Sequence, residues 1–245
     1  MSDVKIETQG KTTVFTIDRP GKMNAISSGV ALGLQAGFAE FDASDAAVAI
    51  ITGSGTKAFS AGADLNDMPE IWRCFPTMGI TTQKPIIVAI EGWCIGGALM
   101  MTALSDLCVA GRSARFSYPE GRVGLTMGVG PALARRLPHK VAMEILLLGD
   151  AFTAERAHAV GLVNRVTEDG AALQGALEMA DRIASMAPMV LKTIKSTVND
   201  HILTPTPSEV MFRRQAEIDA MLKSRDYAEG IAAFNEGRAP QFIGG

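Results

Sequence analysis

Two segments rich in small residues could place backbone amides against a ligand: Phe59–Leu65 (FSAGADL) and Glu91–Leu99 (EGWCIGGAL). Glycine and alanine let a ligand come close to the main chain. Each segment follows a short apolar run and predicts the start of a helix, where N–H groups lack partners within the helix. Two N–H groups pointing at one oxygen form an oxyanion hole, which stabilises negative charge on that oxygen. From spacing alone, an oxyanion hole and simple tight turns are equally good interpretations.

Other reactive patterns are weak in this sequence. Gly53-Ser-Gly55 imitates a dinucleotide-binding turn, but Phe59-Ser-Ala-Gly after it does not resemble the helix that such a turn opens, so a plain strand-to-loop turn is preferred. No phosphate-binding loop, HExxH motif or zinc-spaced cluster occurs, and metal chemistry has no support. The histidines and cysteines are interpreted as scattered or buried residues without a catalytic role: His139, His158, His201, Cys74, Cys94 and Cys108.

Composition limits the possible partners. The chain has 245 residues, a formal net charge of −3 and no dense Lys/Arg run, which argues against nucleic acid as the main ligand. No apolar run approaches the ~20 residues of a membrane helix. The polar N-terminal stretch lacks the apolar region of a signal peptide. Three cysteines without a pairing pattern fit a reducing compartment, so a cytoplasmic protein that does not bind membranes is expected.

Strand and helix patterns alternate along the first part of the chain. Residues 4–8 and 13–18 alternate apolar and polar and predict a hairpin. Three short buried strands are predicted at 48–52, 86–90 and 107–110. Helices are expected between them and, after Pro131, to the end of the chain. Parallel strands need crossover connections, so the sequence predicts an α/β core with a helical C-terminal extension.

Seven motifs spread along the chain resemble those of the crotonase (enoyl-CoA hydratase/isomerase) superfamily. They are RPGKMNA from Arg19, AFSAGADL from Ala58, KPIIVAI from Lys84, GWCIGG from Gly92, FSYPE from Phe116, AHAVGLV from Ala157 and EGIAAFNEGR from Glu229. The resemblance implies the ClpP/crotonase fold, a superhelical core of repeated ββα units over residues 1–187. It also implies a helical region, 188–245, that serves oligomerisation and covers coenzyme A (CoA).

By this resemblance, the oxyanion amides belong to Ala63 and Gly97, and no cofactor is needed, because the substrate itself carries CoA. The positions that match the family's contacts with CoA or substrate are Lys22, Ala25, Ala61, Asp64, Leu65, Asn66, Gly96, Met100 and Phe234. Lys22 either faces a CoA phosphate or is an ordinary surface lysine. Phe234 matches a position that contacts CoA across subunits, although Gly237 replaces the family's usual lysine after glutamate. A homotrimer or a hexamer of two trimers is expected.

The acid–base residues are the informative part of the resemblance. Hydratases of the family resemble one another in having two glutamates, one three residues after the oxyanion glycine and one after a later proline. This chain keeps the second, Glu120, and has Met100 at the first. A thioether cannot exchange a proton at neutral pH. One carboxylate suffices to move a proton within a substrate, as in the family's Δ3,Δ2-enoyl-CoA isomerases. Apolar neighbours such as Met100, Leu125 and Met127 are expected to raise the pKa of Glu120.

Several alternatives stay open at this point. Glu120 is either this acid–base or a surface glutamate in a loop. The protein could be a 2-enoyl-CoA hydratase, an enzyme of another enolate reaction (a decarboxylase, a thioesterase or an isomerase of epoxide CoA esters), or a non-catalytic acyl-CoA-binding homologue. Residues 67–83 hold either an acyl pocket or plain core packing, through Met68, Trp72, Phe75 and Met78.

Overall fold

The computed structural model describes residues 3–244, and its centre is a six-stranded sheet. In spatial order the strands are β1 (Val4–Gln9), β2 (Thr12–Ile17), β3 (Val48–Gly53), β5 (Ile86–Ile90), β7 (Leu107–Gly111) and β10 (Arg165–Thr167). β1 and β2 pair antiparallel, as the predicted hairpin requires, and all other neighbours are parallel. β3 and β5 are apolar and buried on both faces, which is typical of parallel sheets covered by helices.

A second, four-stranded sheet lies beside the first. Its order is β4 (Ala58–Ser60), β6 (Trp93–Ile95), β8 (Arg115–Ser117) and β9 (Phe152–Thr153). Three pairs of consecutive strands, β3 with β4, β5 with β6 and β7 with β8, each place the first strand in the six-stranded sheet and the second in the four-stranded sheet. The chain therefore repeats the same turn and advances by one strand in each sheet every time. This repetition produces the superhelical crotonase-like core that the motifs imply.

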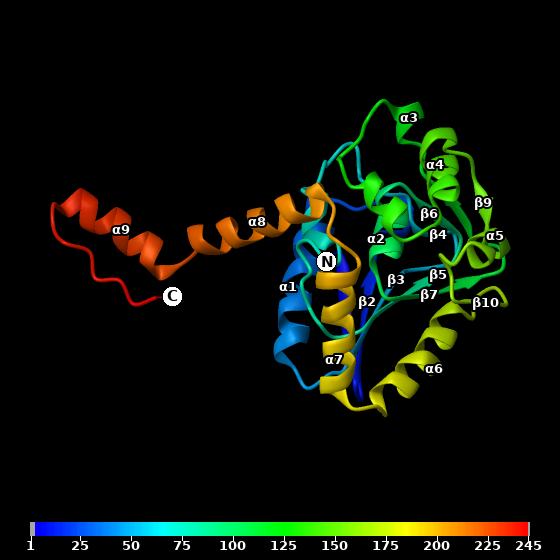
Figure 1. The fold of residues 1–245 in the computed structure, drawn as a ribbon, viewed down its shortest axis with the longest axis horizontal. Helices are drawn as coiled ribbons and strands as arrows, with labels where there is room; N and C mark the ends of the chain where they lie inside the picture. The colour runs from blue at the N-terminus through cyan, green and yellow to red at the C-terminus, as the bar shows by residue number, and fades with distance from the viewer. Residues whose placement is uncertain (1–2, 245) are drawn as a thin grey trace.

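Helices cover the sheets and carry the chain between them (Figure 1). They are α1 (Ser28–Ala43), α2 (Gly97–Leu104), α3 (Glu120–Val123), α4 (His139–Leu148), α5 (Ala154–Ala159), α6 (Ala172–Ala184), α7 (Pro188–Thr197), α8 (Pro207–Leu222) and α9 (Arg225–Glu236). α1 begins at the Ser27 cap and packs Phe38 against Phe15 of β2, with ring centroids 4.2 Å apart. α6 covers the opposite face through a smaller apolar cluster. α2 is buried along its whole length and connects the two sheets.

The expectation of an all-helical chain after Pro131 is wrong. β9 extends the second sheet beside β8, and β10 extends the first beside β7. Both are three residues or shorter, so neither presents enough alternation to reveal a strand, and their pairing depends on an edge formed by residues far away in sequence.

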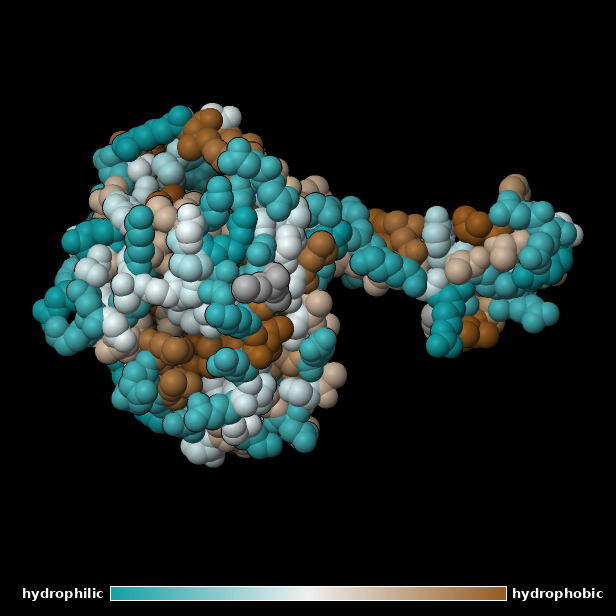
Figure 2. Space-filling model, turned by 180° about the vertical axis from the view of Figure 1, so that it is seen from behind, coloured by the Kyte–Doolittle hydropathy of each residue, from teal (hydrophilic) through white to brown (hydrophobic). Residues whose placement is uncertain are grey.

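The last two helices extend away from the core as an arm (Figure 1). Apolar side chains lie on the surface of this arm among polar ones (Figure 2). The exposed apolar residues include Ile231 and Phe234 of α9, and Phe242 of the segment that follows it. α7 begins at Pro188, where the sequence places the start of a second region, but a separate role for 188–245 stays a prediction. Among the described residues, none of the helices is both long and apolar enough to span a bilayer.

Candidate active site

A mostly apolar pocket opens at the N-terminal end of α2, between the two small-residue segments and the start of α3. Its lining residues are Ala61, Gly62, Ala63, Leu65, Ile71, Ile95, Gly96, Gly97, Tyr118, Pro119, Glu120, Val123, Leu125, Met127 and Val129. The two segments that the sequence predicts as an oxyanion hole therefore meet Glu120 in one pocket. Among these described lining residues, Glu120 is the only one with a carboxyl side chain, and none is a lysine, arginine or histidine.

Glu120 is the first residue of α3, placed there by β8 and the turn through Tyr118 and Pro119. Its Oε2 is buried and accepts no hydrogen bond from any residue in the range 3–244. Burial raises the pKa of this carboxyl from its ordinary value of 4.5 to about 7, in the direction that the sequence predicts. A buried carboxyl that has no fixed partner and faces a pocket is free to exchange a proton with a bound molecule.

Gly96 lets the Glu120 carboxyl approach the start of α2. Its φ is +58°, and a Cβ at this position would lie 2.9 Å from Glu120 Oε1. Any other residue would be strained and would push the carboxyl away. The glycine is thus needed on one side of Glu120, next to the amide of Gly97.

Two backbone amides flank the same space. The Gly97 N–H is the first of α2 and has no acceptor within that helix. On the other segment, Ile26 N–H donates to Gly62 O (2.7 Å) and Asp64 N–H donates to Ile26 O (2.9 Å), a pairing that leaves the Ala63 N–H unused. Within the described chain, neither amide makes a hydrogen bond.

A close contact brings the two amides together. Gly62 has a φ of +84°, and a Cβ there would lie 2.7 Å from Ile95 O and 3.3 Å from Gly97 N. The chain preceding Ala63 therefore passes directly over the start of α2. The prediction that both segments open a helix is wrong for the first one, which forms a turn after β4 and an isolated bridge to Ile26. The bridge, rather than a helix end, frees the Ala63 amide.

Asp64 has a structural environment. Its Oδ2 pairs with Arg19 Nη1 at 3.0 Å, and its Oδ1 accepts the Asn66 N–H at 3.0 Å. The Asn66 amide and the Arg19 guanidinium lower the pKa of Asp64, so the group is charged and already paired. Of this stretch, Ala61 and Leu65 line the pocket, whereas the Asn66 side chain is exposed.

Met100 lies one turn after Gly97 on α2, fully buried in the main apolar core, and is not among the lining residues. The position at which hydratases of the resembled family carry a second glutamate is thus occupied here by a methionine that packs in the core. Leu125 and Met127, in contrast, lie on the pocket wall with Glu120 as expected.

The remaining predicted CoA contacts lie around and beyond the pocket mouth. Lys22 is exposed in the loop after β2, and Ala25 is buried beside it, with its carbonyl bonded to Arg19 Nη1. Phe234 lies on α9 with 86% of its surface exposed, and the structure does not bring it to the pocket of its own chain.

The wall residues that the sequence did not predict include Ile71, Tyr118, Val123 and Val129. Only Tyr118 had a signal, its place in the FSYPE motif. Of residues 67–83, Ile71 alone lines the pocket within the described structure. Of the expected acyl-pocket residues, Trp72, Phe75 and Met78 belong to the core, as the core-packing interpretation has it, whereas Met68 is exposed and fits neither interpretation.

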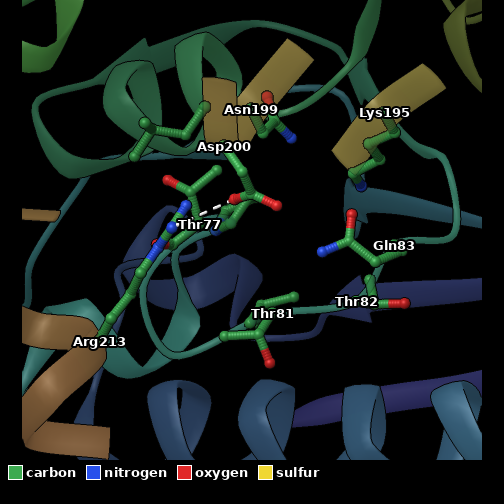
Figure 3. Close-up of a pocket in the computed structure, with 11 residues that line it drawn as sticks. Thr77, Thr81, Thr82, Gln83, Lys195, Asn199, Asp200 and Arg213 are labelled. Atoms are coloured by element: carbon green, nitrogen blue, oxygen red, sulfur yellow. Dashed lines mark hydrogen bonds and ion pairs between the residues drawn. The ribbon is translucent and has the colours of Figure 1, made fainter. Parts of the chain in front are cut away.

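A second pocket lies at the opposite end of α2, next to Leu104, and most of its lining residues have polar side chains (Figure 3). Its charged groups are paired: Arg213 with Asp200 at 3.3 Å, and Lys195 with Asp106 at 2.8 Å. Neither pocket holds a metal-type cluster, since no three His, Cys, Asp or Glu side chains converge anywhere in the described residues.

Comparison with known proteins identifies the family. The family model described as enoyl-CoA hydratase/isomerase matches residues 7–245. A short-chain-enoyl-CoA hydratase of Clostridium acetobutylicum is 30% identical over 97% of this chain and 96% of its own. The crystal structure of a probable enoyl-CoA hydratase/isomerase from Mycobacterium abscessus superposes with a TM-score of 0.77 at 37% identity over 100% of both chains. A carnitinyl-CoA hydratase from Mycobacterium avium superposes equally well, at 32% identity over 99% and 98%.

The chain belongs to the enoyl-CoA hydratase/isomerase family, the crotonase superfamily, and is an enzyme of that family. The names of its relatives point mainly to hydratases, and an acyl-CoA thioester is the substrate consistent with the family.

Proposed function

We propose that this enzyme shifts the double bond of a 3-enoyl-CoA to the 2-position, with Glu120 as its single acid–base. The observation that carries this proposal is that the pocket wall has one carboxyl, Glu120, while the second glutamate position is Met100 in the core. Adding water across a double bond requires a water to be held and activated and a proton to be delivered. Moving a proton from one carbon to another requires one group that takes it and returns it.

The reaction follows from the positions of these groups. The thioester oxygen lies between the Ala63 and Gly97 amides, which stabilise the negative charge on it. The Glu120 carboxylate removes a proton from C2, which gives a dienolate, and the protonated carboxyl then returns that proton to C4. No water is consumed. A pKa of about 7 suits a group that must act in turn as base and acid near neutral pH.

The pocket walls favour an apolar acyl group. Ile71, Val123, Leu125, Met127 and Val129 surround Glu120, and no lysine, arginine or histidine is among the described lining residues. A charged or hydroxylated acyl chain would lose its hydration there without gaining a partner. Unbranched or methyl-branched hydrocarbon chains are therefore the proposed substrates, with CoA outside the pocket mouth near Lys22 and Ala25, and with Asp64 and Asn66 fixing the loop at this mouth.

The apolar side chains of the α8–α9 arm support a trimeric or hexameric assembly. Such an assembly would cover Ile231 and Phe234, which are exposed in the single chain. Light scattering of the purified protein tests this: a mass of three or six chains is expected, and a monomer would contradict it.

The proposal is tested with two substrates and one variant. The wild type is incubated with 3-hexenoyl-CoA and, separately, with crotonyl-CoA, and the products are analysed by mass spectrometry. Conversion of the first ester at unchanged mass, with little water addition to the second and loss of turnover in Glu120→Gln, is expected. Rapid water addition to crotonyl-CoA would overturn the proposal in favour of hydration, the second candidate, which the names of the relatives favour.

A further inference from the structure

The first two turns of α8 bond to segments on two sides of the Glu120 pocket. On one side, Ser208 Oγ donates to Gly128 O at 2.6 Å, and Gly128 lies between the wall residues Met127 and Val129. On the other side, α8 bonds to Thr77, which follows the short 3-10 segment η2 (Ile71–Cys74) that carries the wall residue Ile71. The base of the C-terminal arm therefore joins two parts of the pocket wall that lie far apart in the sequence.

The centre of this junction is Glu209, which is 2% exposed. Its Oε1 accepts from Thr77 Oγ1 (2.8 Å) and from Arg136 Nη2 (2.9 Å), and its Oε2 accepts from the Thr206 N–H and Oγ1 (2.9 Å each). Burial opposes the charge, but Arg136 and the Thr206 and Thr77 bonds outweigh it and hold the pKa of Glu209 below its ordinary value. A fully bonded buried carboxylate is a rigid link, because each partner would be left without its bond if it moved.

Thr77 is held in an unfavourable backbone conformation. Its φ is +66°, a region that β-branched residues rarely occupy and that persists only where the surroundings impose it. Two α8 side chains impose it here: Glu209 on the hydroxyl, and Arg213, whose Nε donates to Thr77 O at 2.6 Å. Figure 3 shows Arg213 beside Thr77 and Asp200.

The strained loop packs on the oxyanion donor. Phe75, two residues before Thr77, has its Cζ 3.5 Å from where a Cβ on Gly97 would lie, and Ile71 Cδ1 is closer still. The Trp72 ring stacks on Phe212 of α8, with centroids 6.0 Å apart. A shift of the Thr77 loop would therefore be transmitted to the side chains that press on Gly97.

We propose that Glu209 is a positioning residue for the acid–base site: by joining Thr77 to Arg136 at the base of the arm, it fixes the separation of the pocket walls around Gly97 and Glu120. The arm thereby controls both the alignment of the oxyanion amide and the exclusion of water from Glu120. Apart from Glu120, Tyr118 is the only ionisable side chain among the described lining residues. The position of the pocket walls, which decides how much water reaches Glu120, therefore controls the protonation of this carboxyl.

The test is the variant Glu209→Gln, which keeps the shape of the side chain and removes its charge. A misplacement near 1 Å lowers rates by up to about 100-fold, so a fall in kcat of about 10- to 100-fold on 3-hexenoyl-CoA is expected. The pH midpoint of Glu120 is expected to fall from about 7 toward 4.5, because water reaches the loosened pocket. Thr77→Val, which deletes one bond and keeps the β-branched shape, should show the same changes to a smaller extent.

The midpoint is measured without turnover, from the pH dependence of the infrared difference spectrum between each protein and its Glu120→Gln counterpart. This inference rests on the proposed function only through the choice of 3-hexenoyl-CoA as assay substrate. If the wild type did not convert this ester, the proposed function would be refuted, and the spectroscopic midpoint would still decide the role of Glu209. Lys195→Gln is the matched control, since it breaks a largely buried ion pair that touches neither wall. It should lower thermal stability and leave kcat and the midpoint unchanged.

An unchanged midpoint in Glu209→Gln and Thr77→Val would overturn the inference, even if kcat fell. A fall in kcat in Glu209→Gln that is explained entirely by a smaller folded fraction, with an equal fall in Lys195→Gln, would also overturn the inference. Glu209 would then have a purely structural role.

Discussion

The two ends of α2 carry two pockets of opposite character. At its N-terminal end, Glu120 is half-buried among apolar walls, and its buried Oε2 has no hydrogen-bond partner among the described residues. At its C-terminal end, beside Leu104, Asp200 pairs with Arg213 (Figure 3), and Lys195 pairs with Asp106. Both regions contain carboxylates and a cavity, so the presence of either feature does not identify the active site.

The difference is whether the charge is compensated. A buried carboxyl without a partner destabilises a fold, and it persists where a reaction needs it. The carboxylates at the other pocket are each paired with a cation and contribute to packing instead. The Glu120 pocket is therefore the reactive one, although the polar pocket presents more hydrogen-bonding groups.

The strongest way to break this comparison is to replace one carboxyl at each end of the helix. Glu120→Gln should lower kcat by about 10²–10⁴-fold, because it removes the group that accepts and returns the proton. Asp106→Asn makes the same chemical change at the polar end, beside Lys195, and should leave turnover unchanged. Both are measured by conversion of 3-hexenoyl-CoA. Equal loss in both variants would mean that the two ends do not differ in function.

Substitutions at the oxyanion amides test the same comparison through the main chain, because they leave the acid–base side chain Glu120 unchanged. Ala63→Pro deletes one donor and should lower kcat by about 10²–10³-fold, whereas Ala63→Ser retains the donor and should remain active. Circular dichroism of both variants checks that they are folded. If the folded proline variant retained full activity, the Ala63 amide would not hold the thioester oxygen.

Stability against pH gives the next effect. The raised pKa of Glu120, about 7 instead of 4.5, means that the folded state binds this proton more tightly than the unfolded chain. Stability is thus lost as the pH rises from about 4.5 to about 7, and Glu120→Gln avoids this loss. Above neutral pH the variant should be more stable than the wild type by something on the order of 2–3 kcal/mol in urea unfolding.

Below pH 4.5 the two proteins should have nearly equal stability. Asp200→Asn serves as the control and should show no gain in stability above neutral pH, because Asp200 is paired with Arg213. A Glu120→Gln variant that is less stable than the wild type above neutral pH would contradict a buried, unpartnered carboxyl.

The smallest effect on turnover is expected for a conservative substitution at Met100. Met100→Leu conserves volume in the core and should cost less than about 1.5 kcal/mol of unfolding free energy, with turnover retained. Met100→Glu should unfold the protein at much lower temperature and add no hydratase activity, because the new carboxyl enters the core. Thermal melts and the crotonyl-CoA assay measure both, and gain of hydration would show that position 100 faces the substrate.

The family resemblance, rather than local pattern, pointed to Glu120, Ala63 and Gly97, since spacing alone left an oxyanion hole and simple tight turns equally good. The structure brings all three to one pocket, while their roles stay predictions. The hairpin and the three central strands followed from periodicity. The wall residues Ile71 and Val129 could not be predicted, since they reach the pocket only through long-range packing. Spacing alone could not reveal that Asp64 is held by Arg19, or that Met100 turns into the core.

The most direct measurement of the central claim follows one hydrogen atom. 3-Hexenoyl-CoA deuterated at C2 is incubated with the wild type in water labelled with heavy oxygen, and the product is analysed by mass spectrometry and NMR. Transfer by one carboxyl predicts a 2-hexenoyl product with deuterium at C4 and no heavy oxygen, and no such product with Glu120→Gln. A product that carries heavy oxygen, or deuterium transfer that survives in the variant, would contradict this mechanism.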